Sequence, residues 1–129
     1  GIPQGVMIRA IEPAAMIEQM SKNRGGKTGP DISNGPGKLV EALAIPQELY
    51  GQSIADSSLR LVFEKKKIPK KIDALPRIGI PNKGEWTEKP LRFVVSGNPY
   101  ISLQRKNQIE EDWGWRKENE KEGSINILR

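Results

Sequence analysis

Apolar positions in this chain occur in short runs, separated by Gly, Pro and charged residues. The run at 6–11 is apolar apart from Arg9 and predicts a strand, and the loose alternation at 59–64 predicts another. Three later segments are also apolar and bounded by turn-forming residues, which predicts strands at 75–80, 91–95 and 100–103.

Two further segments have helical spacing. A helix is predicted at 13–22, where Ile17 and Met20 would share one apolar face. A second is predicted at 36–44, with Pro46 soon after its end. The pattern as a whole predicts the α+β class: a curved, mostly antiparallel sheet with a few short helices, forming a partial domain.

The charge balance favours a polyanionic partner. Of the 129 residues, 21 are Lys or Arg and 16 are Asp or Glu, which gives a net charge of +5. A soluble protein with a moderately basic surface would have the same balance. The lysines at 65–67 and 70–71 leave the same two alternatives, a solvated loop or a segment along a phosphate backbone.

The absence of two residue types limits the chemistry. The chain has no Cys and no His, which excludes disulfides, thiolate nucleophiles and Cys-based metal sites and removes the commonest general base. The lack of Cys fits a cytoplasmic compartment. No apolar run approaches the roughly 20 residues that a membrane-spanning helix needs, so no membrane association is expected.

The composition changes near residue 106. Residues 107–122 are mostly Glu, Lys, Asn and Asp, and Trp113 and Trp115 are the large apolar groups among them. We therefore expect one domain at 1–106 and a charged, flexible or partly helical tail at 107–129.

The segment Asn34-Gly35-Pro36-Gly37-Lys38-Leu39 carries the clearest chemical signal. It places Pro at the first helical position and Lys in the first turn, where backbone N–H groups have no acceptor within the helix. This arrangement suits a phosphate group. An ordinary helix start with a solvent-facing Lys would give the same pattern.

Four segments, at 7–13, 34–39, 76–86 and 89–100, follow one another in an order and at spacings that resemble the C-terminal half of the alkyladenine (3-methyladenine) DNA glycosylase family. The resemblance covers about residues 1–105. It implies excision of damaged purines from double-stranded DNA as the first step of base excision repair. It also implies a base that leaves the stack before water attacks the sugar, and no metal or organic cofactor.

In that family an arginine and a backbone carbonyl hold the attacking water. The block at 7–13 matches the one that bears the arginine, so the resemblance assigns this role to Arg9. The block at 76–80 matches the one that supplies the carbonyl, which assigns that role to the main chain of Ile78. On pattern alone, Arg9 could also be a charge at a strand edge.

The resemblance assigns the DNA-backbone contacts to a second set of residues. Gly37 and Lys38 match the block at the helix start that grips the backbone, and Gly79 allows close approach to phosphates. Lys83, in the turn after Gly79, is a further candidate for a phosphate contact.

The family's general-base glutamate and base-stacking aromatic residues lie upstream of the region that this chain matches. We therefore expect a monomeric protein in which an upstream segment completes the site, with 3-methyladenine, 7-methylguanine, hypoxanthine and ethenoadenine as substrates. Two alternatives stay open: a non-catalytic basic module that binds nucleic acid through phosphates, and a small structural domain whose charges keep it soluble.

Overall fold

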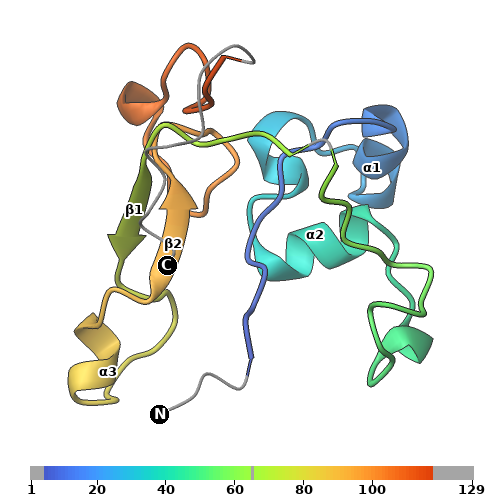
Figure 1. The fold of residues 1–129 in the computed structure, drawn as a ribbon, viewed down its shortest axis with the longest axis horizontal. Coiled ribbons are helices and arrows are strands. Elements are labelled where there is room, and N and C mark those ends of the chain that lie inside the picture. Colours follow the sequence, from blue (N-terminus) through green and yellow to red (C-terminus); the bar gives the residue numbers. More distant parts are fainter. Residues whose placement is uncertain (1–4, 65, 118–129) are drawn as a thin grey trace. The chain divides into compact units, whose positions relative to one another are not determined.

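The chain forms two compact units. The structure, a computed structural model, describes residues 5–64 and 66–117. Unit 1 comprises Gly1–Lys66 and Pro99–Gln104, and unit 2 comprises Lys67–Asn98 and Arg105–Arg129. Figure 1 shows the elements of both units along the chain.

Unit 1 is built from short helices. They are α1 (Ile17–Asn23), the 3₁₀ turn η1 (Gly29–Ile32), α2 (Pro36–Ala42) and the 3₁₀ turn η2 (Gln47–Leu49). The helix α2 packs against both α1 and η1.

The core of unit 1 lies where α1, η1 and α2 meet. Met20, Ile32 and Ala42 form a buried cluster, and Ile11 packs against it. Each of these three elements contributes one residue to the cluster, so the helical spacing predicted around Met20 does serve core packing.

Arg24, which follows α1, ties the three elements together by hydrogen bonds. Its Nε donates to the Ile32 carbonyl at 3.1 Å, and its Nη2 donates to the Asp31 carbonyl at 3.1 Å. Its Nη1 lies 3.1 Å from Oε1 of Glu41 on α2, and only 12% of the Arg24 side chain is exposed. One guanidinium therefore satisfies two carbonyls of η1 and pairs with α2.

The sequence predicts the first residue of α2 correctly but that of α1 wrongly. The helix α2 begins at Pro36 as predicted, with Gly35 as its N-cap, and ends at Ala42. The helix α1 begins at Ile17 rather than at residue 13, because Met16 takes a left-handed conformation with φ of 57°. A residue in that conformation lies outside a right-handed helix.

Unit 2 contains the sheet. Strands β1 (Ile72–Leu75) and β2 (Arg92–Val95) pair antiparallel, with Ile72 opposite Val95 and Leu75 opposite Arg92. The short helix α3 (Glu85–Glu88) lies in the connection between the strands, and the 3₁₀ turn η3 (Lys106–Gln108) follows later. An antiparallel sheet with a few short helices confirms the α+β class.

Residues beyond 106 also take part in unit 2. The amide of Lys70 donates to the Gly114 carbonyl at 2.8 Å, and the amide of Arg116 donates to the Ile68 carbonyl at 2.8 Å. Lys70 also pairs with Asp112 through their side chains. The segment at 107–117 is thus hydrogen-bonded to the chain before β1, while the remainder of the expected tail, 118–129, lies outside the described residues.

Three predicted strands are wrong and one is displaced. The segments 6–11, 59–64 and 100–103 belong to no strand, because no described strand lies beside them to accept their backbone hydrogen bonds. The strand expected at 75–80 ends at Leu75, since Pro76 has no N–H for a ladder. The strand at 91–95 is confirmed as β2.

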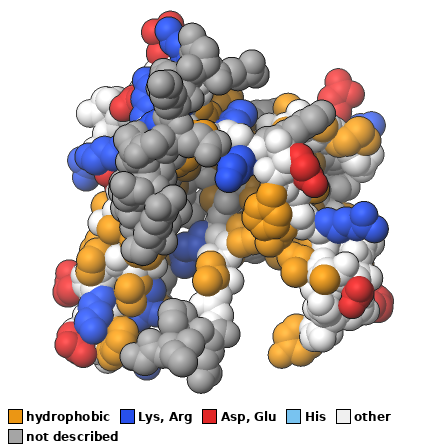
Figure 2. Space-filling model, viewed as in Figure 1, with side chains coloured by type: hydrophobic (Ala, Val, Ile, Leu, Met, Phe, Trp, Pro, Cys, Tyr) orange, Lys and Arg blue, Asp and Glu red, His pale blue; other side chains and the backbone are white. Residues whose placement is uncertain are grey.

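Two of these misplaced segments expose apolar side chains. Val6 and Met7 are 90% and 68% exposed, and Val62 and Phe63 are each 70% exposed. Apolar side chains reach the surface at several places in the space-filling view (Figure 2). Among the described residues, no helix has both the length and the apolar character to cross a membrane.

Gly114 offers a test of how residues near 114 are held in unit 2. Its φ is +81°, and a Cβ there would overlap the Ser96 carbonyl oxygen. We expect Gly114→Ala to lower the free energy of unfolding by about 2–4 kcal/mol, since backbone strain and a steric clash add. All three Trp residues lie in unit 2, so Trp fluorescence during urea unfolding reports this change.

Gly84→Ala is the matched control. Gly84 has φ of 60° and ψ of −132°, a conformation that residues other than Gly rarely adopt, but open space around a Cβ, so strain alone should cost about 1–3 kcal/mol. Equal losses in the two variants would mean that residue 114 does not pack against Ser96.

Candidate functional site

Arg9 lies in the extended segment before α1 and carries an unsatisfied donor. Its Nε is buried and has no hydrogen-bond partner, a property shared within the described residues only by Nε of Arg77. The nearest sulfur, Sδ of Met7, is 3.9 Å from Nη1, which is a weak contact. A buried charged donor without an acceptor is costly, so this guanidinium is suited to a water or an anion that binds there.

The position of Arg9 depends on how its segment is attached to Ser33, the residue that follows η1. Two residues further on, the amide of Ile11 donates to the Ser33 carbonyl at 3.2 Å. The Ser33 hydroxyl donates to the Ile11 carbonyl at 2.7 Å, and Ser33 is completely buried. Both polar groups of Ile11 are satisfied by a single residue, which fixes the backbone beside Arg9.

Lys38 lies in the first turn of α2, beside Gly37, and has two partners inside the chain. Its Nζ donates to Oδ1 of Asp31 at 2.6 Å and to Oδ1 of Asn34 at 2.9 Å. The side chains of Lys38 and Asp31 are 39% and 46% exposed. Gly37 is exposed and a Cβ there would meet nothing within 4 Å, so the backbone is open to an approaching group.

The charge state of Asp31 follows from its surroundings. The hydrogen bond from Lys38 holds the pKa of the Asp31 carboxyl below its ordinary value of 3.8, and the charges of Lys38, Lys27 and Arg24 act in the same direction. Asp31 is therefore ionised at neutral pH.

Two of the four sequence blocks, at 7–13 and 34–39, lie in unit 1, and the end of the block at 89–100 joins them, while its residues 89–98 lie in unit 2. Besides the contact between Ile11 and Ser33, the Ser102 hydroxyl donates to the Asn34 carbonyl at 2.7 Å. Tyr100 has a raised pKa because it is partly buried and because the charge of Glu12 acts on it. The segments around 7–13, 34–39 and 100–102 thus meet within one unit.

The block at 76–86 lies in unit 2, in the connection after β1. Ile78 is half-buried in a bend, and Gly79 is exposed with φ of +75° and open space around a Cβ. Lys83 is exposed, and its amide donates to the Thr87 hydroxyl at 3.0 Å. Arg9 and Ile78, the two residues assigned to the water, therefore belong to different units.

Two side chains fix the ends of this connection. Nη2 of Arg77 donates to the Trp86 carbonyl at 3.2 Å, and Nε of Arg92 donates to the Pro76 carbonyl at 3.0 Å. They link the bend at Ile78 to α3 and to β2. These contacts anchor the chain just before Ile78 and tie it to Trp86 further along.

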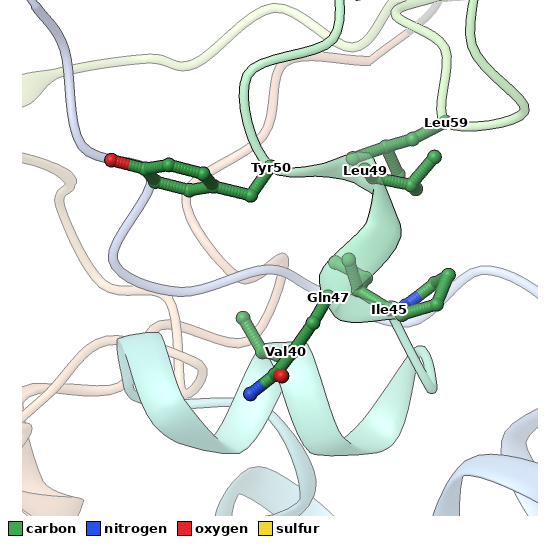
Figure 3. A pocket seen from close by; sticks show the side chains of 7 residues that line it. Val40, Ile45, Gln47, Leu49, Tyr50 and Leu59 are labelled. Carbon is green, nitrogen blue, oxygen red and sulfur yellow. The ribbon is translucent and has the colours of Figure 1, made fainter.

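An apolar groove of about 630 Å³ lies elsewhere in unit 1, between the end of α2, η2 and Leu59 (Figure 3). Tyr50 at its edge is 95% exposed. The residues that line it are Val40, Ile45, Pro46, Gln47, Leu49, Tyr50 and Leu59, and none is a predicted site residue. Within 5–64 and 66–117, no group of three or more Asp or Glu side chains is placed to hold a metal ion.

Asp31 and Ser33 are supporting residues that the sequence alone does not reveal. Both lie shortly before the helix-start block, at positions for which the sequence pattern predicts no role. Their partners are Lys38 and Ile11, and only the folded chain identifies them. The unsatisfied Nε of Arg77 likewise has no signal in the sequence.

Comparison with known proteins identifies the family. The family model for methylpurine-DNA glycosylase matches residues 1–99, and the chain belongs to this family. A protein of Enterococcus faecalis named "Putative 3-methyladenine DNA glycosylase" is 63% identical over 131 residues, which cover 100% of this chain and 57% of that relative.

Two staphylococcal relatives carry the same name. The protein of Staphylococcus saprophyticus is 51% identical and that of Staphylococcus epidermidis is 50% identical, each over 117 residues that cover 90% of this chain and 57% of the relative. The chain thus spans little more than half the length of the relatives that it matches.

The pairing of Asp31 with Lys38 can be tested by titration. By NMR, we expect the Asp31 carboxyl to titrate below pH 3.8 in the unaltered protein and to return toward 3.8 in Lys38→Met, where the hydrogen bond and the charge are both lost. Because the folded-state pKa is lowered, the contribution of this pair to stability is present above pH 3.8 and is lost as the pH falls through the folded-state pKa. An unchanged titration in Lys38→Met would show that the two groups do not interact in solution.

Proposed function

We propose that the protein containing this chain is a monofunctional DNA glycosylase, which hydrolyses the N-glycosidic bond of alkylated or deaminated purines in double-stranded DNA. Family membership supports the reaction class. The observation that carries the assignment to this chain is the buried Nε of Arg9 without a partner, at the position to which the resemblance assigns the attacking water. The proposed substrates are those of the family, including 3-methyladenine and hypoxanthine.

The proposed mechanism begins with a damaged purine that leaves the base stack. Arg9 and the carbonyl of Ile78 then hold a water on the far side of the sugar. The arginine donates a hydrogen bond to the water oxygen and the carbonyl accepts a hydrogen bond from one water O–H, which stays intact, so one lone pair is directed at the sugar carbon. A carboxylate takes the other proton as the glycosidic bond breaks, and the purine leaves with the bonding electrons. The reaction uses water alone as co-substrate.

The DNA backbone would be held by contacts of two kinds. Gly37 and Gly79 are exposed with open space above them, so that a phosphate can approach the main chain. Lys38 and Lys83 would supply positive charge beside these two positions.

We propose that a further segment of the same monomeric protein supplies the carboxylate. In the family that glutamate lies upstream of the matched region, and the relatives are longer than this chain. The same segment would cover apolar side chains such as Met7 and Phe63, which are 68% and 70% exposed in unit 1.

Arg9→Ala tests the water-holding role in the intact protein. We expect single-turnover excision of hypoxanthine from a duplex to slow by about 100-fold, because the water loses its alignment. The dissociation constant for the same duplex should change far less. Rate constants come from alkali cleavage of the abasic product, and dissociation constants come from fluorescence anisotropy.

Arg60→Ala is the matched control, since it removes the same charge from an exposed position of unit 1. It should leave the excision rate nearly unchanged. Equal losses of binding and excision in Arg9→Ala would contradict the water-holding role. An intact protein that binds damaged and undamaged duplex equally and releases no base would instead be a non-catalytic nucleic-acid-binding module.

Lys38→Ala tests the phosphate contact. We expect weaker binding to all DNA sequences and a salt slope that is shallower by about one. Lys22→Ala, which removes an exposed lysine of α1, should change the slope less. A Lys38→Ala slope identical to that of the unaltered protein would remove Lys38 from the phosphate contacts.

A further inference from the structure

The ammonium group of Lys38 already has an anion beside it in the free protein. The carboxylate of Asp31 is 2.6 Å from Nζ, and Asn34 accepts a second hydrogen bond at 2.9 Å. Lys has three N–H donors, so these two contacts leave one. A DNA phosphate that approaches Lys38 must therefore displace the Asp31 carboxylate or bind close to it, against its charge.

Asp31 is well placed to be displaced without any rearrangement of the fold. Its main chain is held in η1, where the Asp31 carbonyl accepts a hydrogen bond from Arg24 at 3.1 Å. Its side chain is 46% exposed, and ion pairs this exposed add little to stability. The carboxylate can therefore turn into water while its backbone stays fixed, so that little stability is lost when Lys38 changes partner.

Asn34 would keep Lys38 in place during the exchange. Its side-chain oxygen accepts from Lys38, and its carbonyl accepts from the Ser102 hydroxyl at 2.7 Å. Asn34 is neutral and does not repel a phosphate. The two partners of Lys38 thus affect phosphate binding differently, since Asp31 would compete with the phosphate for the ammonium group and Asn34 would not.

We propose that Asp31 is an intramolecular competitor for Lys38, occupying the ammonium group in the free protein and yielding it to a DNA phosphate on binding. This inference rests on the proposed function and adds to it a residue that weakens DNA affinity. Weaker binding to each site favours release of undamaged DNA, which a protein that searches for rare lesions requires. If Asp31 instead oriented Lys38 for the phosphate, its removal would weaken binding, so the sign of the effect separates the two roles.

A double-mutant cycle in the intact protein tests the competition. Asp31→Asn removes the charge and keeps the shape, and Lys38→Met removes the ammonium group and keeps most of the stem. Dissociation constants for a hypoxanthine-containing duplex are measured for the unaltered protein, both single variants and the double variant at several salt concentrations. We expect Asp31→Asn to tighten binding by about 2- to 5-fold at low salt when Lys38 is present, the range for exposed ion pairs, and to have little effect in the Lys38→Met background.

Asp73→Asn is the charge-matched control. Asp73 lies on β1 in unit 2, where it pairs with Lys71 at 3.3 Å. This variant changes the net charge equally, and its effect should be the same with and without Lys38. It therefore measures how much of the Asp31→Asn effect is due to net charge alone.

The outcomes distinguish this inference from the function on which it rests. Binding that depends on Lys38 but is unchanged or weakened by Asp31→Asn overturns the competition and leaves the glycosylase proposal intact. The same holds for an Asp31→Asn effect of equal size in both backgrounds. An unaltered protein that fails to bind the duplex overturns both.

Discussion

Two hydrogen bonds between Ile11 and Ser33 fix the segment on which the proposed chemistry depends. This segment belongs to no strand among the described residues, so a neighbouring strand does not satisfy its backbone. The carbonyl and the hydroxyl of fully buried Ser33 both form hydrogen bonds with the backbone of Ile11. The Ile11 side chain packs against the core. Arg9 lies two positions away, so its guanidinium is presented from a short, well-anchored piece of backbone.

The two cations assigned to the site differ in a way that suits different ligands. Nε of Arg9 is buried without a partner, a costly state that a tightly held water would relieve. Lys38 is more exposed and already has two acceptors, so its partners can be exchanged at little cost. A catalytic water must be held in a fixed position, which suits Arg9. A DNA phosphate binds and dissociates, which suits a cation such as Lys38 whose partners can change.

Local patterns predicted the elements that depend on local signals. The helix α2 begins at Pro36, and β2 falls where an apolar run precedes a turn. The segments 6–11 and 59–64 have strand-like patterns, but a strand needs a neighbour, which the pattern does not supply. In the candidate site, the motifs pointed to Arg9 and Lys38, whereas their neighbours Ser33 and Asp31 follow only from tertiary contacts.

The most direct test is a crystal structure of the intact protein on DNA that carries an abasic-site analogue. The account predicts one water within about 3 Å of both the Arg9 guanidinium and the Ile78 carbonyl oxygen, on the face of the sugar opposite the missing base. A separation between these two groups of more than about 6 Å, beyond the reach of a single bridging water, would contradict it.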